Sequence, residues 1–449
     1  MRPSISAEAT AAGKMHGTGG QRDAGLIRAV GPWGLAASII SMMIGAGIFV
    51  VPSQLAASLG SYAPLAFVAA SLGIGAVAIC LAEGGSRIPT SGGIYGYIEA
   101  ALGPLSGYVM GSLLWVSDVL AVSAVAAALG DVATSVASTT HVEALRATII
   151  IGVISTIASV NVRGVMKGTR LITATTVLKL LPLLVLVIAG AAAIHAVNFA
   201  PPLAVKSEGL GRALILATFA LTGMETSLCA SGEVAQPART IPVALTIALT
   251  AVMLLYVAIQ IVVQGILGPA LAGSVAPLAD AMGRISPALR VVMLAGTALA
   301  MIGNITSDML GTPRMLFAFS RDGLLPRVLG RVHARTHTPH IAILVYAALA
   351  TILALSGGFA ELAVLATLAS AGLYIAGCIA AWLLARRGVA LAGTPLGFRW
   401  LGGAVVIGVS SMVALIALAS RTEILGLLAL IAASGAVYLL QTRVAREAP

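Results

Sequence analysis

The stretch Ser41–Pro52 reads SMMIGAGIFVVP and places Gly45 and Gly47 in the middle of an apolar run that is long enough to cross a membrane. A glycine inside a helix costs about 0.5–1 kcal/mol relative to alanine, so the run unwinds most easily here. Unwound backbone at membrane depth is tolerated only where protein buries it or where it lines a wet cavity. We therefore predict a broken helix and a binding site at this point; close helix packing through small residues is the alternative.

The composition is that of a polytopic helical membrane protein. Of the 449 residues, 59% are hydrophobic and 9% are charged. The apolar runs predict an all-α membrane fold with about twelve transmembrane helices. The expected spans are 33–58, 62–84, 104–130, 144–161, 170–196, 212–236, 241–267, 286–318, 340–356, 359–385, 400–420 and 424–441.

Charge placement predicts the orientation of the chain. There are 26 basic and 16 acidic residues, and most of the basic ones fall in alternate loops, on the side that also holds both termini. The positive-inside rule therefore predicts a multi-pass protein of the cell inner (plasma) membrane with both termini in the cytoplasm. Residues 1–25 are polar and are expected to form a disordered cytoplasmic tail, 26–396 the transport core of helices 1–10, and 397–449 helices 11 and 12 with a short cytoplasmic C-terminus.

A second interruption is expected in the sixth span, which contains ATFALTGMETSL. Thr222 and Gly223 lie near its middle, and Glu225 follows directly. Interrupted segments in corresponding positions of two halves are typical of transporter substrate sites. Asp118 in the third span and Lys179 in the fifth are further ionisable groups at membrane depth, where such groups are rare and usually functional.

The two predicted breaks offer complementary groups. Freed amides after the first break suit a carboxylate, and freed carbonyls near Phe219, Ala220 and Leu221 suit an ammonium group, so together they describe an α-amino acid. Walker A, GxSxG and HExxH signatures are missing from the sequence. We expect a protein that is not an enzyme and has no cofactor or metal, with a small amino acid or amine, protons and the bilayer as its partners, and no nucleic acid.

Six stretches together resemble the amino acid, polyamine and organocation (APC) transporter superfamily, and within it the bacterial basic amino acid and polyamine branch. The stretches are MIGAGIFVVPSQLA (43–56), SRIPTSGGIYGYIEAALG (86–103), NVRGVMKG (161–168), LKLLPL (178–183), GMETSLCASGEVAQPARTIP (223–242) and RMLFAFSRDGLLP (314–326). The resemblance implies a 5+5 inverted-repeat (LeuT-like) core with discontinuous helices 1 and 6, followed by two C-terminal helices.

The resemblance also implies roles for particular residues. The first break, Ile44, Gly45, Ala46 and Gly47, would bind the substrate carboxylate. Phe219, Ala220 and Leu221, at the second break, would meet the amino group, with Phe219 as an aromatic gate. Lys179 would stand where sodium-coupled relatives hold a sodium ion and would take part in proton coupling.

The buried acids Asp118 and Glu225 have three possible roles. They could complement a cationic substrate side chain, carry protons, or pair structurally with Lys179 or another polar group. The expected pocket for the substrate side chain consists of Asp118, Thr222, Met224, Glu225, Asn304 and Tyr374.

These expectations describe a secondary active amino acid transporter that works by alternating access, with proton-coupled uptake. The alternative is a sodium-independent exchanger of basic amino acids or polyamines. Sodium symport is the competing mode of coupling. A membrane sensor without transport activity and a channel fit the pattern less well, because neither terminus is long enough for an output domain and no pore-loop repeat is present.

Overall fold

The structure is a computed structural model that describes residues 30–88, 93–137, 140–164, 168–200, 207–228, 234–321, 323–336, 338–391 and 394–447, without the side chains of 168–178, 207–208 and 443–447. The predicted tail at 1–25 lies outside these residues. Within them the chain is almost entirely helical, and the only β-type pairing is an isolated bridge between Val30 and Val234.

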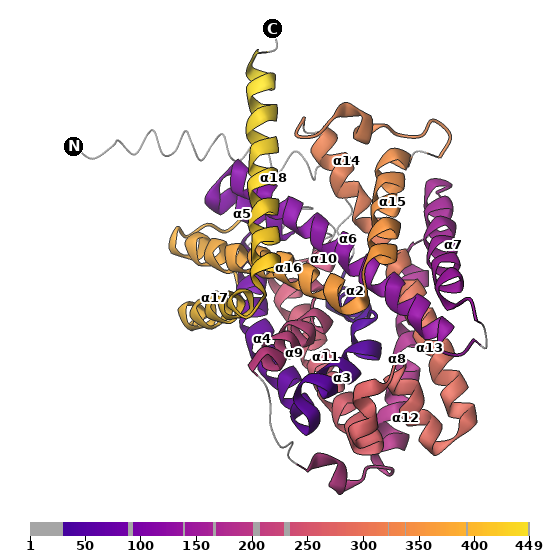
Figure 1. The fold of residues 1–449 in the computed structure, drawn as a ribbon. Coiled ribbons are helices and arrows are strands. Elements are labelled where there is room, and N and C mark those ends of the chain that lie inside the picture. The colour runs from indigo at the N-terminus through magenta and orange to yellow at the C-terminus, as the bar shows by residue number, and fades with distance from the viewer. Residues whose placement is uncertain are drawn as a thin grey trace.

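The helices follow one another in a simple order (Figure 1). They are α2 (Pro32–Met43), α3 (Gly47–Leu59), α4 (Ala63–Arg87), α5 (Ile94–Leu102), α6 (Pro104–Thr134), α7 (Val142–Val162), α8 (Gly168–Ala191), α9 (Ser207–Ala220), α10 (Met224–Leu228), α11 (Pro237–Leu267), α12 (Pro277–Ile285), α13 (Pro287–Gly311), α14 (Pro313–Arg321), α15 (His340–Ser356), α16 (Phe359–Arg386), α17 (Leu401–Ala417) and α18 (Arg421–Glu447). Short 3₁₀ turns are η1 (Gly60–Tyr62), η2 (Ala196–Phe199), η4 (Gly268–Gly273) and η5 (Arg327–Gly330).

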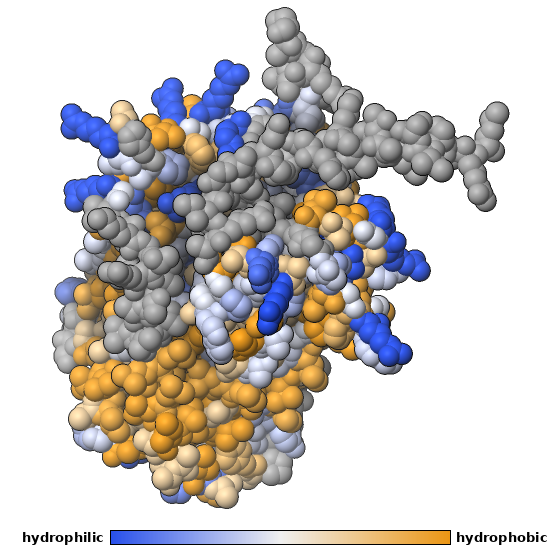
Figure 2. Space-filling model, turned by 180° about the vertical axis from the view of Figure 1, so that it is seen from behind, coloured by the Kyte–Doolittle hydropathy of each residue, from blue (hydrophilic) through white to orange (hydrophobic). Residues whose placement is uncertain are grey.

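The helices are built for a bilayer. Seven helical stretches of the described chain are long and apolar enough to cross a membrane, and four shorter apolar helices accompany them. Figure 2 shows a face where apolar residues form a broad area and hydrophilic residues gather toward one end. Apolar side chains on the surface of the molecule, such as Ile188 and Leu254, are 76% and 68% exposed. Such a surface is stable in contact with lipid, so the protein is a multi-pass membrane protein.

The first and sixth predicted spans are each interrupted. The first consists of α2 and α3, which are separated by Ile44–Ala46, and the sixth consists of α9 and α10, which are separated by Leu221–Gly223. Gly223 has φ +110°, a conformation that favours glycine. A Cβ at Gly223 would lie 3.1 Å from the carbonyl oxygen of Met42, so the second break packs directly against the end of α2.

The core around these breaks is formed by long helices that cross one another. α6 packs along α16, and α16 also contacts α9, which borders the second break (Figure 1). α18 projects away from the rest and is mostly exposed. The short helix α5 follows α4 and packs on α6 and α16. The interrupted segments are thereby held in the interior rather than at the lipid surface.

Candidate functional site

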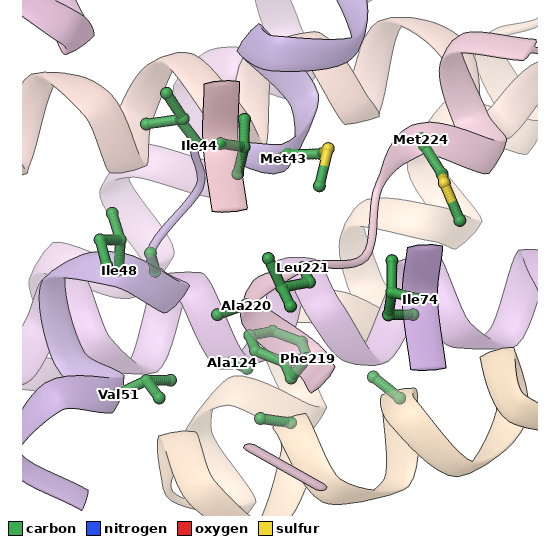
Figure 3. Close-up of a cluster of buried hydrophobic side chains, with 14 of the residues drawn as sticks. Met43, Ile44, Ile48, Val51, Ile74, Ala124, Phe219, Ala220, Leu221 and Met224 are labelled. Carbon is green, nitrogen blue, oxygen red and sulfur yellow. The ribbon is translucent and has the colours of Figure 1, made fainter. Parts of the chain in front are cut away.

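A cavity of about 50 Å³ lies where the two interrupted segments meet. Figure 3 shows this region, with Ile44 and Ile48 on one segment and Phe219, Ala220 and Leu221 on the other. The residues that line the cavity are Met42, Met43, Gly45, Ala46, Gly47, Ser117, Asp118, Ala121, Val125, Phe219, Ala220, Thr222, Gly223, Glu225, Thr226, Asn304 and Asp308. The structure thus brings residues from α6, α13 and both breaks to one place.

The first break leaves donors unpaired. The amide of Gly45 donates to the carbonyl of Met43 (2.9 Å), and the amides of Phe49 and Val50 donate to the carbonyl of Ala46 (3.0 and 3.2 Å). No described acceptor pairs with the amides of residues 46, 47 and 48, which are the first N–H groups of α3. The N-terminal end of α3 can therefore bind an anionic group.

The last carbonyls of α2 are each held by a different part of the protein. The ammonium of Lys179 on α8 donates to Ser41 (3.1 Å), the amide of Asn304 on α13 donates to Met42 (3.3 Å), and the hydroxyl of Tyr256 on α11 donates to Met43 (2.8 Å). A lysine at a helix C-terminus also interacts favourably with the helix dipole. The end of α2 is therefore tied to three other helices.

The second break offers acceptors. The carbonyl of Phe219 accepts from the amide and the hydroxyl of Thr222 (3.1 and 2.7 Å), so both of its lone pairs are in use. The carbonyls of Ala220 and Leu221 have no described donor. The aromatic ring of Phe219 lies edge-on to that of Phe359 on α16, with 5.6 Å between their centroids, and it lines the cavity.

The two breaks are in direct contact. A Cβ at Gly47 would lie 2.8 Å from the Cα of Ala220. A Cβ at Gly45 would lie 3.0 Å from the side-chain amide nitrogen of Asn304. Only glycine fits at position 47 without displacing its neighbour. Any larger residue would place its Cβ against the backbone of Ala220 and force that backbone to move.

Three carboxyl groups lie at one side of the cavity. Asp118 accepts from the hydroxyl of Thr312 (2.9 Å), which also lies 2.6 Å from Asp308. Glu225 accepts from the hydroxyl of Tyr374 (2.6 Å) and from the amide of Gly223 (3.0 Å). All three acids are at most 6% exposed and are close enough to interact electrostatically.

Asp308 is a site residue that the sequence analysis did not assign. Asn304 and Asp308 are four residues apart on α13, so they share one helix face, and that spacing was the available signal. Ser117 and Thr226 also line the cavity without having been predicted. A serine or threonine in an apolar helix carries little information by itself, since it also forms hydrogen bonds within its own helix.

Several predicted residues lie near the cavity without lining it. Ile44, Leu221 and Met224 are fully buried among apolar side chains. Tyr374 reaches the site through its hydrogen bond to Glu225. Lys179 is 2% exposed, and among the described residues it forms no ion pair with an acid; its hydrogen bond goes to Ser41.

Comparisons with known proteins show the family of the chain. A family model described as amino acid permease matches residues 30–433. The chain is 30% identical over 335 residues to the methylthioribose transporter of Bacillus subtilis, covering 70% of this chain and 72% of that protein. It is 27% identical over 412 residues to the branched-chain amino acid permease BcaP of Bacillus subtilis, covering 86% of each.

A third relative is the serine/threonine exchanger SteT of Bacillus subtilis, which is 28% identical over 350 residues, covering 74% of this chain and 78% of that protein. The family match spans most of the chain and includes both interrupted helices. The chain belongs to the amino acid permease family of the APC superfamily.

Proposed function

We propose that this protein is a secondary active transporter that carries an amino acid across the membrane by alternating access. The observation that carries the proposal is the meeting of two broken helices at one cavity, with unpaired amides on one side and unpaired carbonyls on the other. The amides of Ala46 and Gly47 would bind the α-carboxylate, and the carbonyls of Ala220 and Leu221 would bind the α-ammonium group. Phe219 would close the cavity as a gate.

The proposed architecture has about twelve membrane-spanning helices in a 5+5 inverted-repeat (LeuT-like) arrangement with two further helices at the C-terminus. Support comes from the two interruptions, which divide the first and sixth predicted spans. The domain limits 26–396 and 397–449 and the cytoplasmic location of both termini belong to the same proposal.

The proposed coupling is to protons. The ammonium of Lys179 is hydrogen-bonded to the C-terminal end of α2, where a fixed cation would make a bound sodium ion unnecessary. Loss of its proton would weaken its hold on Ser41 and let the end of α2 move. The carboxyl groups of Asp118 and Glu225 are further candidates to carry protons.

The substrate side chain is the open part of the proposal. The relatives named above are described as transporting methylthioribose, branched-chain amino acids, or serine and threonine. Their names favour a substrate with a neutral side chain. Such a side chain needs no carboxylate partner, so the acids near the cavity would carry protons instead. The basic amino acid or polyamine alternative rests on the same carboxylates acting as partners of a cationic side chain. Exchange of one amino acid for another is the second candidate function, and SteT supports it by name.

The test of the function is a counterflow screen with purified protein in proteoliposomes. Vesicles are loaded with each common amino acid or diamine, and entry of the same labelled compound is measured at two pH values. We expect counterflow for at least one amino acid and none for the corresponding amine without a carboxylate. A protein that shows no counterflow with any compound, although it is folded and inserted, contradicts the proposal.

Proton coupling is tested with Lys179→Ala. We expect this variant to lose the stimulation of uptake by an inward proton gradient, while sodium has no effect on the wild type. Uptake that is still driven by the proton gradient in the variant contradicts the assigned role of Lys179.

The role of the acids is tested with Asp118→Asn and Glu225→Gln. For a neutral substrate we expect substrate affinity to persist while the response to the gradient falls. Selective loss of affinity for arginine, lysine or diamines would instead show that the carboxylates bind a cationic side chain.

A further inference from the structure

A second, smaller cavity of about 20 Å³ has a lining that shares no residue with the transport cavity. It is lined by the end of α7, the junction of α13 and α14, and the start of α15, with Asn161, Arg314 and Thr338 as its polar members. About 10–15 Å³ is enough for one water-sized group, so the cavity can hold a single oxygen atom while the rest of a larger ligand stays outside.

Asn161 is the feature that needs an explanation. It is 4% exposed, and neither the nitrogen nor the oxygen of its side-chain amide has a hydrogen-bond partner among the described residues. Burying such a group without a partner costs about 1–3 kcal/mol. Asn161 opens NVRGVMKG, a stretch that the transport mechanism does not use. The N–H groups of this amide are therefore donors available to an acceptor at the cavity.

Arg314 supplies positive charge at the same cavity. Its guanidinium donates to the carbonyl of Leu310 and forms no ion pair with any acid that the structure describes. The five N–H groups of an arginine leave several donors for an outside acceptor. Arg163 follows α7 directly and is exposed. The sequence from 314 to 335 contains five arginines and a single acid.

The helices beside the cavity carry apolar side chains on their surface. Apolar side chains on the outer faces of α7 and α15 are strongly exposed, for example Ile151 at 45% and Leu344 at 54%. Donors that lie between lipid-facing helices at a basic end of the protein match the position of anionic headgroups at a membrane surface. One oxygen atom of a phosphate group fits the cavity, and the rest of the lipid headgroup would lie outside the cavity opening.

We propose that Asn161 and Arg314 form a binding site for the phosphate of an anionic membrane phospholipid, with one phosphate oxygen in the cavity between α7, α13 and α15. The amide nitrogen of Asn161 and the guanidinium of Arg314 both donate to that oxygen. This cavity shares no lining residue with the transport cavity, so the lipid-site proposal can be tested independently of the proposed transport function.

The experiment is native mass spectrometry of the full-length protein titrated with phosphatidylglycerol and, separately, with phosphatidylcholine. We expect the wild type to bind phosphatidylglycerol more tightly. Asn161→Leu and Arg314→Gln should each weaken that binding by roughly tenfold, the effect of losing one charge-assisted hydrogen bond. Arg327→Gln is the matched control, because Arg327 is an exposed arginine of the same basic segment.

Each other outcome overturns the proposal. Equal binding by all four proteins means that the cavity holds only a water molecule. The site would instead bind a free anion if inorganic phosphate alone raised the unfolding temperature and this rise required Asn161 and Arg314, while lipid binding did not require them. Should Asn161→Leu fail to fold, Arg314→Gln alone decides between these outcomes, since Arg314 is exposed.

Discussion

At the scale of the residue, the two glycines of the first break have different surroundings. Gly47 faces the backbone of Ala220, whereas Gly45 faces the side chain of Asn304. A side chain can turn aside, but the backbone of α9 cannot without moving the second break. We infer that Gly47 sets the distance between the two broken segments, and that position 45 tolerates a side chain better than position 47 does.

The first prediction concerns Gly47→Ala. Its Cβ would lie 2.8 Å from the Cα of Ala220, so we expect loss of counterflow and a destabilisation of about 1–3 kcal/mol, as for other overpacked sites. Counterflow and thermal unfolding measure the two effects. The control is Gly402→Ala on α17, where no atom lies within 4 Å of the added Cβ. Wild-type counterflow in Gly47→Ala would show that the close contact is not required.

At the scale of the element, α2 is a short helix whose C-terminal end is held from outside. Its final carbonyls bind Lys179, Asn304 and Tyr256, which come from α8, α13 and α11. Helix ends leave carbonyls unpaired, and in a membrane water does not satisfy them. Such contacts hold the break in place, and we expect the loss of any of them to shift α2 relative to α3.

The second prediction tests this arrangement with Tyr256→Phe. The variant keeps the ring, which packs edge-on against Phe67 at 5.8 Å, and removes the donor to Met43. We expect a stability loss of about 1–3 kcal/mol, because a buried carbonyl loses its side-chain donor, together with weaker substrate-induced stabilisation. Both are read from thermal unfolding with and without substrate. Tyr438→Phe on the exposed helix α18 is the control and should behave as the wild type.

Another element, the C-terminal end of α4, anchors the connection between α16 and α17. Glu83 is fully buried and accepts from Arg87 (2.8 Å) and from the amide of Phe398 (3.1 Å). Arg87 in turn donates to the carbonyl of Val389 (3.0 Å). The pair thus joins segments that are about 300 residues apart in sequence.

The third prediction is that Glu83→Leu destabilises the protein by about 3–5 kcal/mol, since it leaves the charge of Arg87 buried without its partner. The comparison is Glu361→Leu, which removes an exposed pair with Arg212 at 3.6 Å and should cost about 0–1 kcal/mol. Chemical or thermal unfolding in detergent gives both values. Similar losses in the two variants would show that the buried pair does not anchor the connection.

At the scale of the whole molecule, the placement of the basic residues predicts one orientation in the membrane. Hydrophilic side chains gather toward one end of the face in Figure 2. The basic segment at 314–335 and Arg386 and Arg387 at the end of α16 fall on the side predicted to be cytoplasmic. The loop between α6 and α7 is predicted to lie on the other side.

The fourth prediction follows from that orientation. Green fluorescent protein fused after Pro449 should fluoresce, and alkaline phosphatase fused at the same place should be inactive, because the C-terminus is predicted to be cytoplasmic. Alkaline phosphatase inserted after Thr140, in the loop between α6 and α7, should be active. The opposite pattern of activities would reverse the proposed topology.

The sequence alone determined the class of protein and the positions of the two breaks. Apolar length predicts membrane helices, and Gly45, Gly47 and Gly223 mark where helices are weakest, because both properties depend on neighbouring residues only. The breaks were found where they were predicted, at Ile44–Ala46 and Leu221–Gly223.

Tertiary structure decided how these parts meet. It brought Asp308 beside Asp118, with the hydroxyl of Thr312 between them, and joined Tyr374 to Glu225. It also placed Lys179 against Ser41 rather than against an acid. The sequence could not supply these pairings, since they depend on how separate helices pack and which polar atoms are then within hydrogen-bonding distance.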